Sequence, residues 1–413
     1  MSLLFSAYVS VVLGALYAIY AFFFDRPSRI HAIPTVGGPS LPLLSYIGAV
    51  RSLTKAMDII QEGYTKYKGR CFKYAEFGHW CVVVTSPAAV EELARAPEDV
   101  LSFKAAAIDL TQLRYTLGSN VTQNLYHMGT VRTHLMRNAG RMFDDIRDKV
   151  VSVFTDEVQS AKGEHEWVSV GAADLAREAN DLLQWLVETA PHGHERTVRA
   201  LVLRVLTVNF AGVHTTSAIF TDALYYLAAY PEHAAALREE VERIVRADGW
   251  SKASLGSMRL VNGFLKEVFR VAALNTLSLN RIALQDYTFA DGTFIPKGTS
   301  VAVASRNLLL EADCYVNPTV FDPRRYEGEG GSPKDNSART DDHYLVFGHG
   351  QHACSGRFFA VTVLKAMLAH IVITYDVKFP GGSRSIPPPM WIGGSRVPNG
   401  KANVLFRKRD VCE

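Results

Sequence analysis

One long helical stretch constrains the fold of this chain more than any other feature of its sequence. From Glu195 to Pro231, apolar residues recur at helical spacing over about 35 residues, or roughly 50 Å of helix. Because a helix of this length crosses a whole globular domain, other helices must pack around it. The rest of the pattern does not alternate strands with helices, as a parallel α/β sheet requires. We therefore expect a mainly α fold with small β-sheets.

Shorter elements are predicted on both sides of the long helix. Residues 71–87 predict two strands with a turn at Gly78, and residues 279–303 predict further short strands. Helical spacing predicts further helices at residues 132–154, 168–187, 232–247 and 260–272, and an apolar helix from residue 356 that leads into a strand.

The N-terminal sequence predicts a membrane anchor. Leu3 to Phe24 comprises 22 residues without a charge, enough for a helix to cross a hydrocarbon core of roughly 30 Å. A cleaved signal peptide is the alternative, but the stretch is too long for a typical h-region and no basic n-region precedes it. Arg26 and Arg29 follow the span, which favours a cytoplasmic location for the rest of the chain.

The expected domain organisation follows from this anchor. Residues 1–24 form the transmembrane helix, and residues 25–45 form a hinge in which four prolines and two glycines prevent a continuous helix. Residues 46–413 form one large domain. The net charge of +3 is mild and basic residues are scattered, which argues against a nucleic-acid partner. The five cysteines are odd in number and include no C-x-x-C, as expected in a reducing compartment.

One cysteine has a setting that suits a metal ligand. Cys354 lies in the sequence YLVFGHGQHACSGRFFAV, directly before a predicted helix. The free N–H groups and the positive dipole end of that helix should favour a thiolate. Gly350 and Gly356 allow tight turns and the close approach of a flat group, and Phe347 supplies an apolar wall. A single thiolate does not make a zinc site, but it can supply one axial bond to a haem iron.

This loop resembles the haem-binding loop of the cytochrome P-450 family, the haem-thiolate monooxygenases. Residues 347–356 match the pattern F-x-x-G-x-[RH]-x-C-x-G. Two further family motifs follow the expected order, the E-x-x-R pair of Glu267 and Arg270 and an F-x-P-x-R segment that supplies Arg325. The resemblance implies a cytochrome P-450-like fold, haem b with Cys354 as axial ligand of its iron, and a structural cluster of Glu267, Arg270 and Arg325.

Residues 210–217 resemble the oxygen-activation segment of the same family, A-G-x-[DE]-T-[TS]. The resemblance implies that Gly212 lets the long helix widen locally and that the Thr215 hydroxyl holds a water for proton delivery. His214 replaces the acidic residue of the pattern, as it does in similar fungal members. On the structural alternative, Thr215 bonds back to a carbonyl one turn earlier. Both interpretations can hold together.

The resemblance also implies anchors for the haem propionates, because charged donors to carboxylates make strong hydrogen bonds. The predicted anchors are His352, Arg281, Arg132 and His127. For the last two, a solvated surface role is the alternative. The predicted substrate-facing residues are Val213, residues 274–279, Met390 and Trp391.

The chain departs from the family in one interval. Only 88 residues separate His127 from Thr215, whereas the family places several more helices between these landmarks. We expect a missing internal segment near residues 179–181, which would contain part of the central bundle and the roof of the substrate pocket. One flank of the long helix should therefore be open.

The function implied by the resemblance is insertion of one oxygen atom from dioxygen into an apolar small molecule, such as a terpenoid or another fungal secondary metabolite. An NADPH-dependent flavoprotein reductase would supply the electrons. The anchor would hold the protein in the lipid of the endoplasmic reticulum membrane as a single-pass protein with a cytoplasmic catalytic domain. The alternative is a truncated relative that binds haem without productive turnover.

Overall fold

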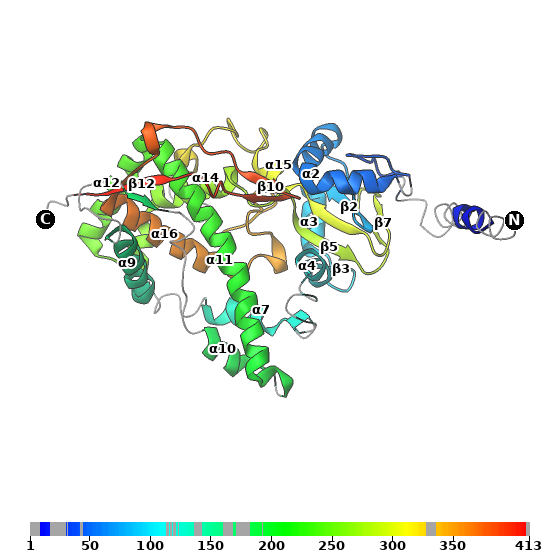
Figure 1. Cartoon of the computed structure of the whole chain (residues 1–413), viewed down its shortest axis with the longest axis horizontal. Helices are drawn as coiled ribbons and strands as arrows, with labels where there is room; N and C mark the ends of the chain where they lie inside the picture. Colours follow the sequence, from blue (N-terminus) through cyan, green and yellow to red (C-terminus); the bar gives the residue numbers. More distant parts are fainter. Residues whose placement is uncertain are drawn as a thin grey trace. The chain divides into compact units, whose positions relative to one another are not determined.

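The computed structural model of the chain is drawn in Figure 1. It describes residues 9–16, 30, 32–41, 44–112, 115, 118, 121–122, 124–135, 143–159, 168–170, 182–191, 193–327 and 336–409. These residues divide between two compact units. Unit 1 comprises residues 1–110, 276–308 and 392–394, and unit 2 comprises residues 111–275, 309–391 and 395–413.

Unit 1 is built on a five-stranded sheet. In spatial order its strands are β1 (Phe72–Glu76), β2 (His79–Val84), β8 (Ser300–Val303), β5 (Ser278–Ala283) and β3 (Leu101–Ser102). Only the β2–β8 pair is parallel within this sheet. Gly78, with φ of +84°, makes the β1–β2 turn. The strands expected at residues 71–87 and 279–303 are therefore confirmed.

Helices and a small hairpin complete unit 1. They are α2 (Ser45–Tyr67), α3 (Pro87–Arg95), the start of α4 (Phe103–Thr111), the start of α15 (Ser305–Leu309), and the hairpin of β6 (Tyr287–Thr288) and β7 (Phe294–Ile295). The α2 helix approaches β1 closely at Gly63, where a Cβ atom would overlap the ring of Phe72. Only glycine leaves room for this approach.

Unit 2 is organised around the predicted long helix, α11 (Val198–Ala229, 32 residues). The Thr197 side chain caps its start by accepting a hydrogen bond from the N–H of Ala200. Pro231 opens the next helix, α12 (Pro231–Asp248). The C-terminal part of α11, from Ile219 to Ala229, is mostly buried in the core of this unit.

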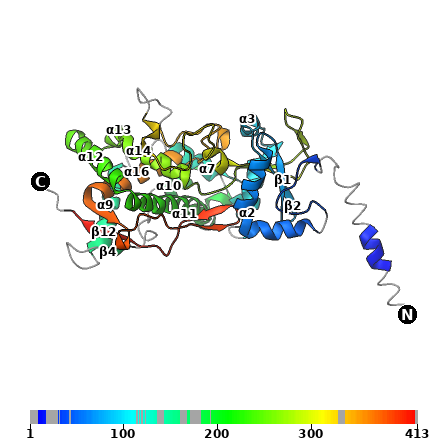
Figure 2. The same ribbon diagram turned by 90° about the horizontal axis from the view of Figure 1, so that it is seen from above.

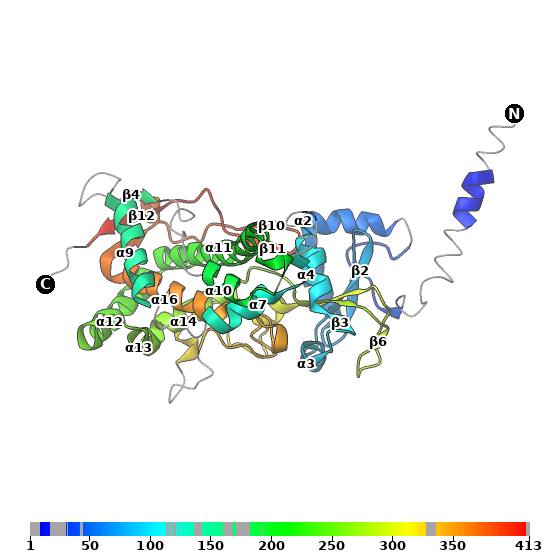
Figure 3. The same cartoon turned by 90° about the horizontal axis from the view of Figure 1, so that it is seen from below.

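Among the described helices, three contribute most of the residues that share that core with α11. They are α12, α14 (Arg259–Val271) and α16 (Arg357–Thr374). Figure 3 shows α9 (Phe143–Gln159) beside α16, and Figure 1 shows α7 (Tyr126–Thr130) and α10 (Leu182–Thr189) near the N-terminal part of α11. The short helix α13 (Lys252–Ser257) follows α12.

The small sheets of the C-terminal region include strands that the sequence analysis did not place, namely β4, β10, β11 and β12. Strand β4 (Val168–Val170) pairs antiparallel with β12 (Val404–Lys408), which also pairs with β9 (Tyr375–Lys378), as Figure 2 shows for β4 and β12. The prediction of a helix at residues 168–187 is thus wrong at its start. At its end, residues 182–187 are helical and belong to α10. Two further strands, β10 (Met390–Ile392) and β11 (Ser395–Val397), form a separate pair.

Other helix predictions agree with the structure in part. The helix expected at residues 132–154 appears as a π-helical turn, η3 (Val131–Leu135), and as α9, with residues 136–142 outside the described set. Of the predicted anchor, residues 9–16 are helical and the remaining residues of 1–24 lie outside the described set. Among the described residues, α16 is the one helix long and apolar enough to cross a membrane, and half of it is buried in the protein.

Candidate functional site

The Cys354 loop is a tight backbone structure directly before α16. Gly348 and Gly350 have φ values of +70° and +71°, which side-chain-bearing residues rarely adopt. The Cys354 N–H donates to the carbonyl of Phe347 at 2.8 Å, which closes the loop. Gly356, by contrast, has a φ of −92° that any residue can adopt, although the space beside it is open. A turn that requires glycine is therefore present at Gly350 and not at Gly356, and the close approach of a flat group to Gly356 stays a prediction.

The Cys354 side chain is exposed, but its thiol does not ionise as readily as expected. Protein atoms around the sulfur desolvate it and raise its pKa, and this effect exceeds the opposing influence of the Gly356 and Arg357 N–H groups and the Arg357 charge. The helix N-terminus lowers the pKa of the thiol, as expected, but desolvation is the larger effect. A bound iron would deprotonate the ligand outright.

Two arginines donate hydrogen bonds to backbone carbonyls of the loop. Arg132, from η3, donates to the carbonyl of Gln351 at 2.9 Å, and Arg357 donates to the carbonyl of Cys354 at 2.7 Å. Arg132 is exposed, and its role as a propionate anchor stays a prediction. Arg357 was not predicted from the sequence, although it stands three residues after Cys354.

Beneath the loop, Phe347 packs its ring against Phe269 of α14, with the ring centroids 5.1 Å apart. The wall that the sequence predicted is therefore anchored in the core of unit 2. His352 ends the short helical turn η7 (Gly350–His352) and is half-buried. Its role as a propionate anchor stays a prediction.

The predicted cluster of Glu267, Arg270 and Arg325 is assembled in the structure. Glu267 accepts from Arg270 through both carboxylate oxygens, at 2.6 and 2.8 Å, and from Arg325 at 3.2 Å. The Asp322 N–H and the Tyr326 hydroxyl, from the segment that supplies Arg325, also donate to this carboxylate. Burial raises the pKa of Glu267, but these partners together outweigh burial and lower it. The cluster joins α14 to the segment before the loop.

The oxygen-activation segment lies in the middle of α11 with its predicted residues exposed. The Thr215 hydroxyl donates to the carbonyl of Ala211 at 2.8 Å, which is the structural alternative named above. The His214 ring meets the Phe210 ring edge-on at 5.1 Å. At Gly212 the space for a side chain is open, and α11 continues through it as α-helix. The local widening expected at Gly212 is therefore absent.

One face of α11 is apolar and uncovered. Val198, Val202, Leu206, Phe210 and Val213 recur every three or four residues and are 42–79% exposed. All residues from 209 to 215 are exposed. In a water-soluble domain a helix normally buries such a stripe against neighbours. Among the described residues this stripe has no covering partner, whereas residues 136–142, 160–167 and 171–181, which precede α11 in the chain, lie outside the described set. The open flank stays a prediction.

His127 occupies a buried polar cluster at the N-terminal part of α11. Arg204, which is fully buried, places Nη1 at 3.0 Å from His127 Nδ1 and binds both oxygens of Glu195 through Nη2 at 2.9 Å. Burial, followed by the Arg204 charge, lowers the pKa of His127 to about 4. Because a guanidinium only donates, the ring proton belongs on Nε2. His127 is therefore a neutral donor rather than the charged one expected.

Arg281 lies on β5 in unit 1 and is 1% exposed. Its Nη1 donates to the carbonyl of Asn280 at 2.9 Å, while Nε and Nη2 have no hydrogen-bond partner among the described residues. Burial lowers the pKa of this guanidinium to about 10. A buried cation with two unsatisfied donors suits a carboxylate ligand. Within unit 1, Arg281 therefore fits a propionate group, and within unit 2 the exposed residue Cys354 fits an axial bond to a haem iron.

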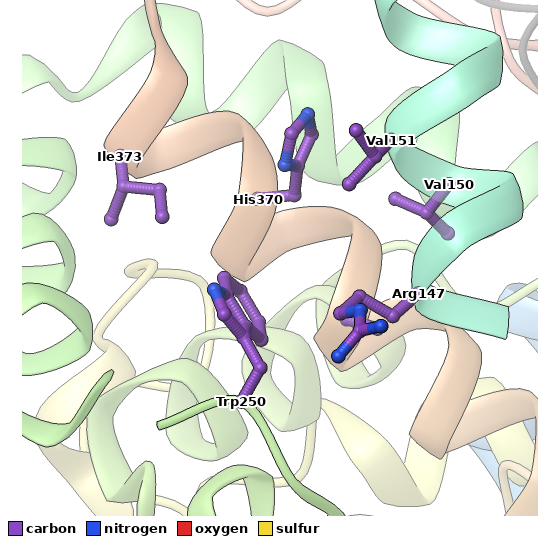
Figure 4. Close-up of a pocket in the computed structure, with 7 residues that line it drawn as sticks. Arg147, Val150, Val151, Trp250, His370 and Ile373 are labelled. Atoms are coloured by element: carbon purple, nitrogen blue, oxygen red, sulfur yellow. The ribbon is translucent and has the colours of Figure 1, made fainter. Parts of the chain in front are cut away.

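The substrate-facing residues predicted from the sequence lie in both units, and their role stays a prediction. Val213 and Met390 are exposed, and residues 274–279 divide between the two units. Figure 4 shows a cavity of about 390 Å³ in unit 2, between α9 and α16. It is lined by Arg147, Val150, Val151, Trp250, Ala366, His370 and Ile373. No predicted site residue lines it, so this cavity is separate from the predicted substrate site.

Comparison with known proteins agrees with these motifs. The family model described as Cytochrome P450 matches residues 104–406. Cytochrome P450 monooxygenase 103 of Postia placenta is 34% identical over 493 residues, covering 97% of this chain and 97% of the relative. Cytochrome P450 monooxygenase 151 of the same fungus is 34% identical, covering 95% of this chain and 97% of the relative.

A third relative is similar over a shorter length. Ent-kaurene oxidase P450-4 of Gibberella fujikuroi is 34% identical over 56% of this chain and 47% of its own length. The alignment with monooxygenase 103 extends over 493 residues, whereas this chain has 413. That relative therefore contains residues without a counterpart here.

Proposed function

This chain belongs to the cytochrome P450 family, and from that premise we propose that it inserts one oxygen atom of dioxygen into an apolar small molecule. The Cys354 loop carries this proposal, because it presents an exposed cysteine directly before α16. Cys354 would bind the iron of haem b, with Phe347 and Gly356 bordering the group. When bound, the haem supplies the activation of dioxygen and the transfer of one oxygen atom.

The protein's own residues would position the group and move protons. Arg281 would donate from its buried Nε and Nη2 atoms to a propionate, and His352 and Arg132 would supply further donors. The Thr215 hydroxyl, now bonded to Ala211, would turn to hold a water in place of the carbonyl. His214, one position before it, would replace the usual carboxylic acid as the group that exchanges protons with solvent.

The partners and location follow from the family and from the N-terminal sequence. Monooxygenases of this family take electrons from a redox partner, and we propose an NADPH-dependent flavoprotein reductase. The uncharged stretch from Leu3 to Phe24 supports a single-pass anchor in the endoplasmic reticulum membrane, with a cytoplasmic domain. The name of the relative ent-kaurene oxidase supports a terpenoid or similar fungal metabolite as substrate.

The uncovered face of α11 bears on how well this form works. Water that reaches Thr215 and His214 screens the charges on which proton delivery depends. We therefore propose that the 413-residue form releases much of its reducing power as peroxide, and that a longer product with extra residues near Asn180 couples electrons to product. The longer alignments of the relatives support such a product.

One experiment, in which enzyme turnover is followed, tests both proposals. The full chain in microsomes with a flavoprotein reductase is given NADPH, isotope-labelled dioxygen and a panel of terpenoids, and NADPH consumption, peroxide and labelled product are measured together. The Cys354→Ala variant is the matched control. We expect Cys354-dependent NADPH consumption, labelled product, and peroxide in excess of product. Loss of any Cys354 dependence would disprove the monooxygenase function, whereas tight coupling would disprove only the consequence of the open flank.

A further inference from the structure

A thiol, an imidazole and a carboxylate lie side by side on the surface of unit 2. Cys314 Sγ lies 3.2 Å from His343 Nδ1, and Nε2 of the same ring lies 3.6 Å from Asp342 Oδ2. Cys314 is exposed, and the side chains of His343 and Asp342 are each 39% exposed. A thiol within reach of an imidazole base is an arrangement that activates the thiol. The Asp342 carboxylate, at 3.6 Å, is a charged neighbour of the ring rather than a hydrogen-bond partner.

The backbone holds these groups in place on both sides. Asp341 Oδ1 accepts from the N–H groups of His343 and Tyr344, at 2.9 and 2.6 Å, which fixes the turn that carries the imidazole. On the other side, the Cys314 N–H donates to the carbonyl of Glu311 at 3.1 Å. The chain after Cys314 is tied down by Arg270, whose Nη1 donates to Pro318 at 2.6 Å.

Carboxylates gather in the chain segments that carry the pair. Asp341 and Asp342 belong to the turn that carries His343, and Asp313 precedes Cys314 in the chain. Arg270 reaches the segment that follows Cys314, with its guanidinium 5.0 Å from the centre of the neighbouring Tyr315 ring.

We propose that Cys314 is a peroxide-reactive thiol that forms a sulfenic acid with His343 as its base. His343 takes the thiol proton, and the sulfur attacks one oxygen of hydrogen peroxide. The S–O bond forms as the O–O bond breaks, so that sulfur loses two electrons and the peroxide is reduced. The leaving hydroxide takes the proton from the imidazolium and departs as water. The product is an exposed sulfenic acid that a second thiol can reach.

Two other cysteines provide the contrast within the same molecule. Cys71 and Cys81 are buried, and burial raises the pKa of Cys71 to about 11 and that of Cys81 well above its usual range. Both should be inert to peroxide under conditions in which Cys314 reacts.

The experiment uses the full haem-loaded chain, hydrogen peroxide and dimedone, with peptide mass spectrometry to assign each adduct. We expect Cys314 to be labelled first and Cys71 and Cys81 to stay unlabelled. The His343→Gln variant should slow labelling of Cys314 about tenfold, because an unassisted thiol is only a few per cent ionised near pH 7. Asp342→Asn should slow it less.

A matched control is His194→Gln, which alters a histidine on η4 (His194–Arg196) and should leave Cys314 labelling unchanged. The haem spectrum of each variant shows whether the protein is folded. Equal labelling of Cys314 in His343→Gln and in the unaltered chain would overturn the proposal. So would labelling of Cys71 at the rate of Cys314.

Discussion

The carboxylate of Glu267 connects two arginines and two further donors in a fully buried position. It accepts hydrogen bonds from Nε and Nη2 of Arg270, from Arg325, from the Asp322 N–H and from the Tyr326 hydroxyl. Glu267 and Arg270 have no exposed side-chain surface. A buried charge of this kind stabilises the fold only while its partners remain.

Replacing Glu267 with glutamine should therefore destabilise the protein strongly. Two guanidinium groups would lose their counter-charge in a buried place, which costs about 3–5 kcal/mol. The free energy of unfolding in urea measures the loss. Glu232→Gln is the matched control, because its partner Arg384 lies 3.4 Å away and both side chains are more than half exposed. If the two variants unfolded alike, the buried cluster would not have the structural role assigned to it.

The buried imidazole of His370 predicts a loss of stability in acid. Burial lowers its pKa in the folded protein to about 4, against 6.5 in an unfolded chain. Between these values the unfolded state binds more protons, so the contribution of His370 is complete above about pH 6.5 and is lost as the pH falls towards 4. The thermal midpoint of the native chain should fall more steeply over this range than that of His370→Phe. Parallel curves for the two proteins would contradict this assignment.

Individual site residues could be predicted from the sequence where a motif fixes their spacing. Cys354, Glu267 and Arg270 could be named because residues close together in the chain define them. Arg204 could not, because its partners come from residues 121–127 as well as from Glu195. Likewise the thiol pKa of Cys354 depends on desolvation by surrounding atoms, which the helix dipole argument omits.

At the scale of elements, α14 depends on one close contact. A Cβ atom at Gly263 would overlap the carbonyl oxygen of Pro323, at the start of η5 (Pro323–Tyr326), which carries Arg325. Gly263→Ala should therefore destabilise the protein, although alanine favours helix over glycine by roughly 1 kcal/mol. Gly256→Ala in α13, where a Cβ meets open space, should be neutral or stabilising in the same unfolding measurement. If both variants raised the free energy of unfolding by the same amount, α14 would be able to shift away from η5, and the prediction would be wrong.

The long helix and the strand β4 show which elements a sequence can predict. Residues 198–229 keep helical spacing over many turns, so α11 was expected nearly at its observed ends. Strand β4 has only three residues, and its partner β12 follows more than 230 residues later. Local periodicity contains no information about such a partner, so residues 168–170 were assigned to a helix.

At the scale of the whole molecule, the anchor and the surface near the hinge predict how the protein meets a membrane. Leu41, Leu44, Tyr46, Ile47, Val50 and Leu53 are 46–60% exposed. Deleting residues 2–24 should therefore release the protein from microsomes only in part, because this apolar surface can still adsorb to lipid. Salt and detergent extraction of both forms measures the release. A full-length protein that fractionates without membranes, or that is glycosylated in its main domain, would contradict the proposed topology.

The central claim is that Cys354 supplies a thiolate to a haem iron. The full chain, loaded with haem, reduced and exposed to carbon monoxide, should show the red-shifted absorption band of a thiolate-bound ferrous haem. Cys354→Ala should abolish this band, whereas Cys314→Ser, which alters another exposed cysteine, should retain it. A band that persists unchanged in Cys354→Ala would contradict the assignment of the ligand and the proposed chemistry with it.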